Sequence, residues 1–152
     1  MPGACCGAQR RDMMVGEVSP GLIAILGEAR AREKEQALFY RGLAASAAEA
    51  GLRVETERLN ELHADEQHHL SRLTARLLEL GATPDDLRRV EAPGSSLEDW
   101  EAEARHREGA EVGWYEGQLG ADLDGRTRAL FEEILESERK HREQLGGKWM
   151  SA

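Results

Sequence analysis

The sequence is poor in the residues that mark several common classes of protein. Only 2 of its 152 residues are cysteine, and these neighbours, Cys5 and Cys6, can form neither a disulfide framework nor a C-x-x-C metal site. Aromatic residues make up 5% of the chain, and no apolar run approaches the roughly 18 residues of a transmembrane helix. We therefore predict a soluble, cytoplasmic protein that does not interact with a membrane.

Positive charge is also scarce. The chain has 20 Lys and Arg residues against 29 Asp and Glu residues, and its formal net charge is −9. Binding to a nucleic acid requires clustered positive charge, so we predict no nucleic-acid partner. What is abundant is alanine, leucine, glutamate and arginine, a composition that favours helices in a single domain.

The chain divides into three segments. Residues 1–18 show no periodicity and are expected to form a flexible leader, residues 19–146 a helical domain, and residues 147–152 a short tail. Helix start and stop signals predict four helices within the domain. They run from Ser19-Pro20 to about residue 50, from 52 to 80, from a capping box at Ser95 or Ser96 to 119, and from the 120–125 turn to about 145.

The lengths of the connections predict how these helices are arranged. The first and last pairs are joined tightly, whereas residues 82–96 form one long connection. These 15 residues can extend to about 50 Å, and the first helix is about 45 Å long. The long segment can therefore return along the whole bundle. We predict an all-α four-helix bundle made of two helical hairpins with a long crossover between helices 2 and 3.

Each predicted helix carries charged side chains on its apolar face. The leucine stripe of the second helix, for example, is interrupted by Glu66 and His69. Glu33 interrupts the first apolar face, Glu108 and Glu111 the third, and Glu138 and His141 the fourth. A buried carboxylate without a partner costs several kcal/mol, and no lysine lies on these faces to neutralise it. Two divalent cations would balance Glu33, Glu66, Glu108 and Glu138, with His69 and His141 completing the ligand set.

The spacing of these residues repeats in the two halves of the chain. Glu33 precedes Tyr40 by seven residues, as Glu108 precedes Tyr115, and a Glu-x-x-His pair follows in each half. The second glutamate follows the first by 33 residues in one half and by 30 in the other. In an antiparallel hairpin these spacings place both glutamates at the same height. The repeat therefore predicts one shared dinuclear site between the two hairpins, built on Glu-x-x-His motifs.

Together, Glu33…Tyr40, Glu66-x-x-His69, Glu108…Tyr115 and Glu138-x-x-His141 resemble the ferritin-like di-iron carboxylate superfamily, with rubrerythrin and bacterioferritin as the nearest likeness. The resemblance implies two iron ions, although the ligands also suit Mn or Zn. The sequence departs from rubrerythrin in lacking the two CxxC knuckles of a rubredoxin domain, so an electron donor is expected to be a separate protein or to be absent. It departs from bacterioferritin in lacking a convincing haem ligand, so we expect no haem.

The resemblance also implies roles for individual residues. Glu33 and Glu108 are expected as terminal ligands, Glu66 and Glu138 as bridges, and His69 and His141 as one nitrogen ligand each. Glu111 lies on nearly the same face as Glu108 and could be a seventh ligand, a hydrogen-bond partner of the ligands or a charge at the rim of the site. It matches a second glutamate that ligates iron in rubrerythrin, and as a ligand it is expected to cap a metal or shift with its redox state. Tyr40 and Tyr115 are expected either to donate hydrogen bonds to the bound carboxylates or to serve as ordinary core residues.

The function expected from this site is the reduction of hydrogen peroxide, or of O2, by two Fe(II) ions that become Fe(III). Two alternatives stay open within this chemistry, namely ferritin-type iron oxidation and storage, and oxygenation of an organic substrate. A third is a structural bundle without metal. We also expect a homo-oligomer, and storage would require one that encloses a cavity.

Overall fold

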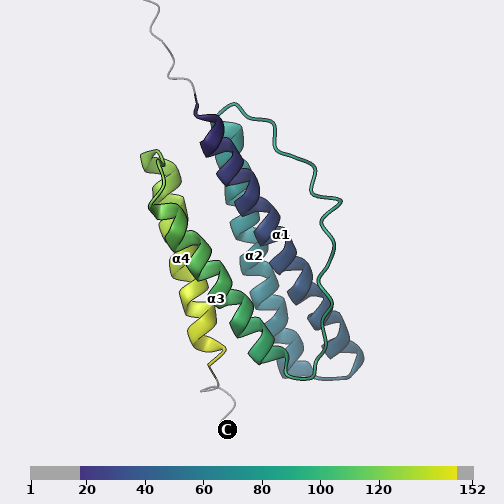
Figure 1. Cartoon of the computed structure of the whole chain (residues 1–152). Coiled ribbons are helices and arrows are strands. Elements are labelled where there is room, and N and C mark those ends of the chain that lie inside the picture. The colour runs from purple at the N-terminus through teal and green to yellow at the C-terminus, as the bar shows by residue number, and fades with distance from the viewer. Residues whose placement is uncertain (1–17, 147–152) are drawn as a thin grey trace, which may run out of the picture.

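A computed structural model describes residues 18–146, which form four helices and no strand. The helices are α1 (Pro20–Glu49), α2 (Arg53–Glu79), α3 (Trp100–Leu119) and α4 (Gly125–Gln144). The α1–α2 hairpin lies beside the α3–α4 hairpin, and the connection between α2 and α3 runs back along the length of the bundle (Figure 1). The predicted all-α bundle with a long crossover is confirmed. The predicted leader, except Val18, and the tail lie outside the described residues, as do Cys5 and Cys6.

Three of the predicted helix boundaries have a clear local cause. Gly51 and Gly81 follow α1 and α2 with φ angles of +71° and +75°, a left-handed conformation that favours glycine. Asp124 precedes α4, and its side chain accepts a hydrogen bond from the backbone N–H of Thr127 at 2.9 Å. This contact satisfies one of the free N–H groups at the helix start.

The predicted capping box at the start of α3 is wrong. The helix begins at Trp100, and Ser96 instead accepts a hydrogen bond from the backbone N–H of Glu98 in a local turn. Leu97 packs against an apolar cluster, and Trp100 is only 6% exposed. Seating Leu97 and Trp100 in the core takes precedence over the cap, so the helix begins at Trp100 and not at the serines.

The long connection is held against the first hairpin by polar contacts. Arg30 donates one hydrogen bond to the backbone oxygen of Asp85 and another to the hydroxyl of Thr74 on α2. Further along, a side chain at Gly42 would place its Cβ 3.3 Å from the Ser95 hydroxyl, so this glycine allows the connection to lie close to α1. The crossover thereby covers the outside of the bundle.

The apolar core is divided into two clusters, one toward each end of the bundle. One contains Leu26, Leu73 and Phe131 among its buried residues, and the other contains Phe39, Leu43 and Leu59. The glutamates and histidines predicted as ligands lie between the two clusters along the helices. The bundle therefore encloses a charged layer between two apolar ones.

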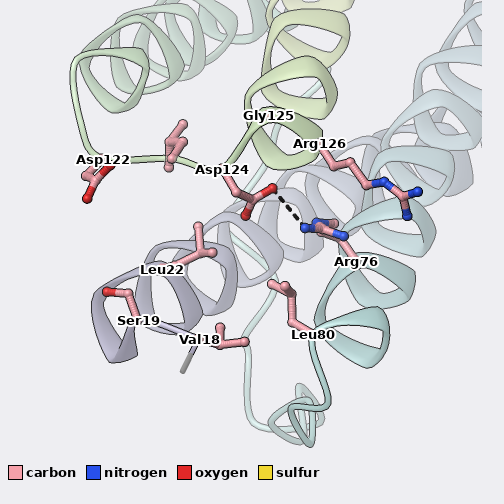
Figure 2. Close-up of a pocket in the computed structure, with 10 residues that line it drawn as sticks. Val18, Ser19, Leu22, Arg76, Leu80, Asp122, Asp124, Gly125 and Arg126 are labelled. Carbon is pink, nitrogen blue, oxygen red and sulfur yellow. Dashed lines mark hydrogen bonds and ion pairs between the residues drawn. The ribbon is translucent and has the colours of Figure 1, made fainter. Parts of the chain in front are cut away.

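A hollow of about 700 Å³ lies at one end of the bundle, beside the start of α1 and the α3–α4 turn (Figure 2). Arg76 donates a hydrogen bond to Asp124 across it at 2.8 Å. None of its lining residues is a predicted ligand. Within the described part of the chain, no helix combines the length and the apolar character that a membrane span needs.

Candidate metal centre

All four helices contribute ionisable residues to the charged layer. Each of these residues is buried, with an exposed fraction of 5% or less. They are Glu33 of α1, Glu66 and His69 of α2, Glu108 of α3, and Glu138 and His141 of α4. Each lies on the apolar face of its helix, as the periodicity predicts. The fold therefore brings together the six side chains that the sequence singles out.

The six side chains form two overlapping groups that could each hold a metal ion. One group is Glu33, Glu66, His69 and Glu138, and the other is Glu66, Glu108, Glu138 and His141. In each group, one ligand atom per residue lies within 4.8 Å of the others. Glu66 and Glu138 belong to both groups. This overlap is the geometry expected when two carboxylates bridge a pair of ions.

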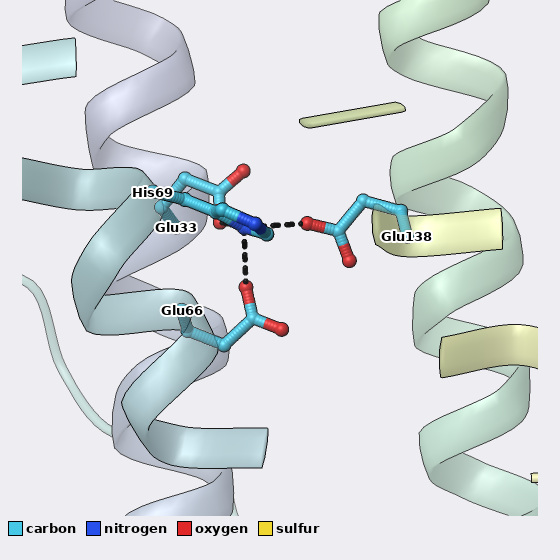
Figure 3. Close-up of side chains that lie close together, drawn as sticks. All are labelled: Glu33, Glu66, His69 and Glu138. Atoms are coloured by element: carbon cyan, nitrogen blue, oxygen red, sulfur yellow. Dashed lines mark hydrogen bonds and ion pairs between the residues drawn. The ribbon is translucent and has the colours of Figure 1, made fainter. Parts of the chain in front are cut away.

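The histidine side chains lie among the carboxylates. Nδ1 of His69 is 2.9 Å from a Glu138 oxygen and 3.2 Å from a Glu33 oxygen, and Figure 3 shows its ring between the two hairpins. Nδ1 of His141 is 3.3 Å from both Glu66 and Glu138. Each imidazole therefore presents one nitrogen to its own group.

Asp65 is a member of the site that the sequence reasoning missed. Its carboxylate lies 3.0 Å from Nε2 of His141, the ring nitrogen that faces away from the cluster. Such a contact fixes the orientation of a ligating imidazole and raises its basicity. Asp65 is an exposed residue about 100° around α2 from Glu66. Hydrophobic periodicity therefore carries no signal that could have identified it.

The two tyrosines connect the halves of the cluster crosswise. The Tyr40 hydroxyl of α1 donates a hydrogen bond to Glu108 of α3, and the Tyr115 hydroxyl of α3 donates one to Glu33 of α1. Both tyrosines are fully buried. Burial raises the pKa of each hydroxyl well above its usual value, and the neighbouring carboxylates raise it further. Both side chains therefore remain neutral donors at physiological pH.

The metal-free cluster is electrostatically strained. Burial raises the pKa values of Glu66 and Glu108 to about 8, although contacts with the histidines oppose the shift. Burial alone would lower the pKa of His69, but its contacts with Glu138, Glu33 and Glu66 raise it to about 12. The pKa of His141 is raised for the same reason. Without cations, the cluster therefore compensates its negative charge by holding protons.

Several carboxylate oxygens in the cluster accept no well-directed hydrogen bond. Both oxygens of Glu66, one of Glu108 and one of Glu138 are buried and accept none from the described residues, although a histidine Nδ1 lies 2.9 Å from the Glu138 oxygen and 3.3 Å from one Glu66 oxygen. Buried polar atoms in native proteins are nearly always paired, so unpaired ones need an explanation. A pair of divalent cations fits this donor set, since carboxylate and imidazole are ligands for Fe, Mn and Zn.

Glu111 is buried, at 7% exposure, but lies outside both groups. Its two oxygens accept hydrogen bonds from Arg32 of α1, each at 3.0 Å. Burial raises its pKa to about 7, while Arg32 opposes the shift. The predicted role of Glu111 as a ligand therefore requires that it first leave Arg32.

No protein-family model and no curated protein sequence matches the chain. Among solved structures, it is similar to the bacterioferritin of Desulfovibrio desulfuricans, with a TM-score of 0.75 and 22% identity over 82% of this chain and 75% of that one. It is also similar to the bacterioferritin BfrA of Mycobacterium tuberculosis, with a TM-score of 0.78 and 18% identity over 89% of this chain and 87% of that one. The chain has the ferritin-like fold. The D. desulfuricans protein contains a diiron site that was captured in different catalytic states.

Proposed function

We propose that this chain binds two iron ions in the buried cluster and oxidises Fe(II) there. The observation that carries the proposal is the pair of overlapping ligand groups, in which several buried carboxylate oxygens accept no well-directed hydrogen bond from the described residues. The ferritin-like fold supports the choice of iron, because one similar bacterioferritin contains a diiron site. Mn and Zn are expected to compete for the same ligands.

The six residues divide into three pairs in this proposal. Glu33 and His69 would hold one ion, Glu108 and His141 would hold the other, and Glu66 and Glu138, which belong to both groups, would serve both ions. When bound as Fe(II), the two ions would supply one electron each. These two electrons, with two protons, convert one H2O2 to two H2O or one O2 to one H2O2. The hydroxyls of Tyr40 and Tyr115 orient the terminal carboxylates, and the two apolar clusters exclude bulk water.

The identity of the oxidant separates two candidate activities. The similar structures are bacterioferritins, which favours ferritin-type oxidation of iron by O2 over the peroxide reduction expected first from the sequence. Peroxide reduction keeps support from Glu111, the extra carboxylate beside the cluster that resembles the rubrerythrin pattern. We propose iron oxidation by O2 as the main activity and peroxide reduction as the second.

Stopped-flow mixing tests the proposal. The metal-free protein is loaded anaerobically with two Fe(II) per chain and mixed with O2 or H2O2. With either oxidant, we expect Fe(III) absorbance to appear faster than it does for Fe(II) in buffer. If iron oxidation by O2 is the main activity, the absorbance should appear faster with O2 than with H2O2. Glu66→Ala should abolish the acceleration, whereas Glu61→Ala, an exposed glutamate of the same helix, should not. Oxidation no faster than in buffer contradicts the proposal.

Storage and turnover place further requirements on the protein. Iron storage needs an assembly that encloses a cavity, so we propose a homo-oligomer, whose mass light scattering would measure. Uptake of many Fe per chain by a large assembly would support storage, and a small assembly would limit the activity to oxidation. We also propose that a separate electron-donor protein returns the iron to Fe(II).

A further inference from the structure

Two arginines cross between α1 and α3 beside the metal centre. Arg32 immediately precedes Glu33 on α1, and Arg107 immediately precedes Glu108 on α3. Arg32 donates to both oxygens of Glu111, whereas Arg107 donates to the amide oxygen of Gln36 at 2.6 Å and to a carboxylate oxygen of the exposed Glu35 at 3.0 Å. The two arginines therefore occupy matching positions in the two halves of the bundle.

Aromatic rings support both guanidinium groups. The Arg32 guanidinium lies 5.1 Å from the ring centre of Trp114, and that of Arg107 lies 4.7 Å from the ring centre of Phe39. Trp114 is itself fixed by a 2.9 Å hydrogen bond from its Nε1 to Glu28. Cation–π contacts of this kind hold a guanidinium in place without using its N–H donors. Arg32 therefore has a support that does not depend on Glu111.

The two halves differ in the side chain that each arginine holds. Gln36 is neutral and a poor ligand, whereas Glu111 is a carboxylate one turn along α3 from Glu108, on the same face. Both of its oxygens bind a single guanidinium, the geometry of a strong bidentate pair. The contact occupies the oxygens that a metal ion would need.

Space for rearrangement lies next to this pair. A cavity of about 260 Å³ between α1 and α3 is lined by both arginines, Gln36, His106 and Glu111. Nε2 of Gln36 has no hydrogen-bond partner among the described residues. The Arg32–Glu111 pair therefore borders open space and is not enclosed by the apolar core.

We propose that Arg32 is a positioning residue that holds Glu111 away from the metal centre and sets whether this seventh carboxylate joins the ligands. The inference rests on the proposed function, because it requires metal ions in the cluster. Arg32 and the cations compete for Glu111. Removing the guanidinium therefore frees the carboxylate to bind, and metal affinity rises. The carboxylate that Arg107 holds belongs to Glu35, an exposed residue about 200° around α1 from Glu33, so removing Arg107 frees no ligand for the metal centre.

Titration of the metal-free protein with cobalt(II), followed by its visible absorbance, tests this inference. The proposed function predicts two bound cobalt ions per wild-type chain. Arg32→Gln should bind at least one of them about tenfold more tightly, the effect expected from freeing one charge-assisted contact. Arg107→Gln removes the same charge from the matching position and should change the affinity less than about threefold. Arg32→Lys keeps the charge but loses the fork geometry, and should give an intermediate gain.

A second background separates ligand release from simple loss of positive charge. In Glu111→Gln, the further change Arg32→Gln should give no gain in cobalt affinity. A gain of equal size in that background, or no gain from Arg32→Gln in the wild type, overturns the inference while leaving the proposed function intact. A wild-type chain that binds no cobalt overturns both.

Discussion

Replacing Glu66 by glutamine should change the stability of the protein in opposite directions with and without metal. Glu66 is 0% exposed and belongs to both ligand groups. Burial raises its pKa from 4.5 to about 8, and each pKa unit corresponds to about 1.4 kcal/mol. Keeping this carboxyl in the metal-free fold therefore costs about 3 kcal/mol at pH 7 and about 5 kcal/mol at pH 9.

The sign follows from proton binding. A carboxyl whose pKa is higher in the folded state holds its proton there over a pH range in which the unfolded chain has lost it. The folded state is therefore destabilised as the pH rises from about 4.5 to 8, and the penalty then stays constant. Glutamine cannot ionise and so has no such penalty, although its neutral amide interacts less favourably with the protonated histidines than a carboxylate does. We expect metal-free Glu66→Gln to be more stable than the wild type by about 1–3 kcal/mol at pH 9, and the gap to close toward pH 5.

Metal should reverse this order. Binding to the folded state alone contributes about 2.7 kcal/mol per site at a free metal concentration 100 times Kd. The wild type should gain this stabilisation at both sites, whereas Glu66→Gln loses a shared ligand and should gain much less. Urea unfolding at pH 5, 7 and 9, with chelator or with saturating cobalt(II), measures both effects.

Glu61→Gln is the matched control, because Glu61 is an exposed glutamate of the same helix. Its effect should stay within about 0.5 kcal/mol in all conditions. If Glu66→Gln destabilises the metal-free protein at pH 9, or if metal stabilises both variants and the wild type equally, the reasoning about this buried carboxylate is refuted.

Three further predictions follow from the same structure. The metal-free wild type should lose stability as the pH rises from 5 to 9 in denaturant unfolding, because the pKa values of Glu66 and Glu108 are raised to about 8 and that of His69 to about 12; stability that rises over this range would contradict the account. Metal binding at pH 7 should release about two to four protons per chain, including one from His69 and one from His141, as measured by calorimetry in buffers of different ionisation enthalpy; uptake or no exchange of protons is the opposing result. Gly113→Ala should raise the free energy of unfolding by about 1 kcal/mol, because alanine favours a helix interior over glycine and the added Cβ would contact no other atom of the described chain. A loss of stability, measured by the same unfolding, would indicate a neighbour outside this chain.

The inward-facing carboxylates could be predicted because helical periodicity identifies which side chains lie on the apolar faces. Glu33 and Glu138 share those faces with leucine, alanine and phenylalanine, so burying the apolar residues necessarily buries the charges as well. Convergence on one point followed from the hairpin spacings, which place the glutamates of each hairpin at equal heights. The core and the ligand layer are therefore consequences of a single pattern.

Other features depend on contacts between helices that no local pattern encodes. Asp65 and Arg32 are partly or fully exposed, and their roles arise from side chains that reach a partner on another helix. The helix α3 begins later than its capping signal predicts, because the packing of Leu97 against the core overrides that local signal. Long polar side chains and helix ends thus depend on tertiary packing, whereas apolar faces can be recognised from sequence.

Metal content per chain tests the central claim most directly. The purified protein is stripped with chelator, reloaded anaerobically with excess Fe(II), desalted and analysed for elemental iron against protein concentration. The two overlapping ligand groups predict two iron ions per chain, reduced to one or none in Glu66→Ala and unchanged in Glu61→Ala. A wild-type chain that retains no iron, or that retains the same amount as Glu66→Ala, would contradict the account.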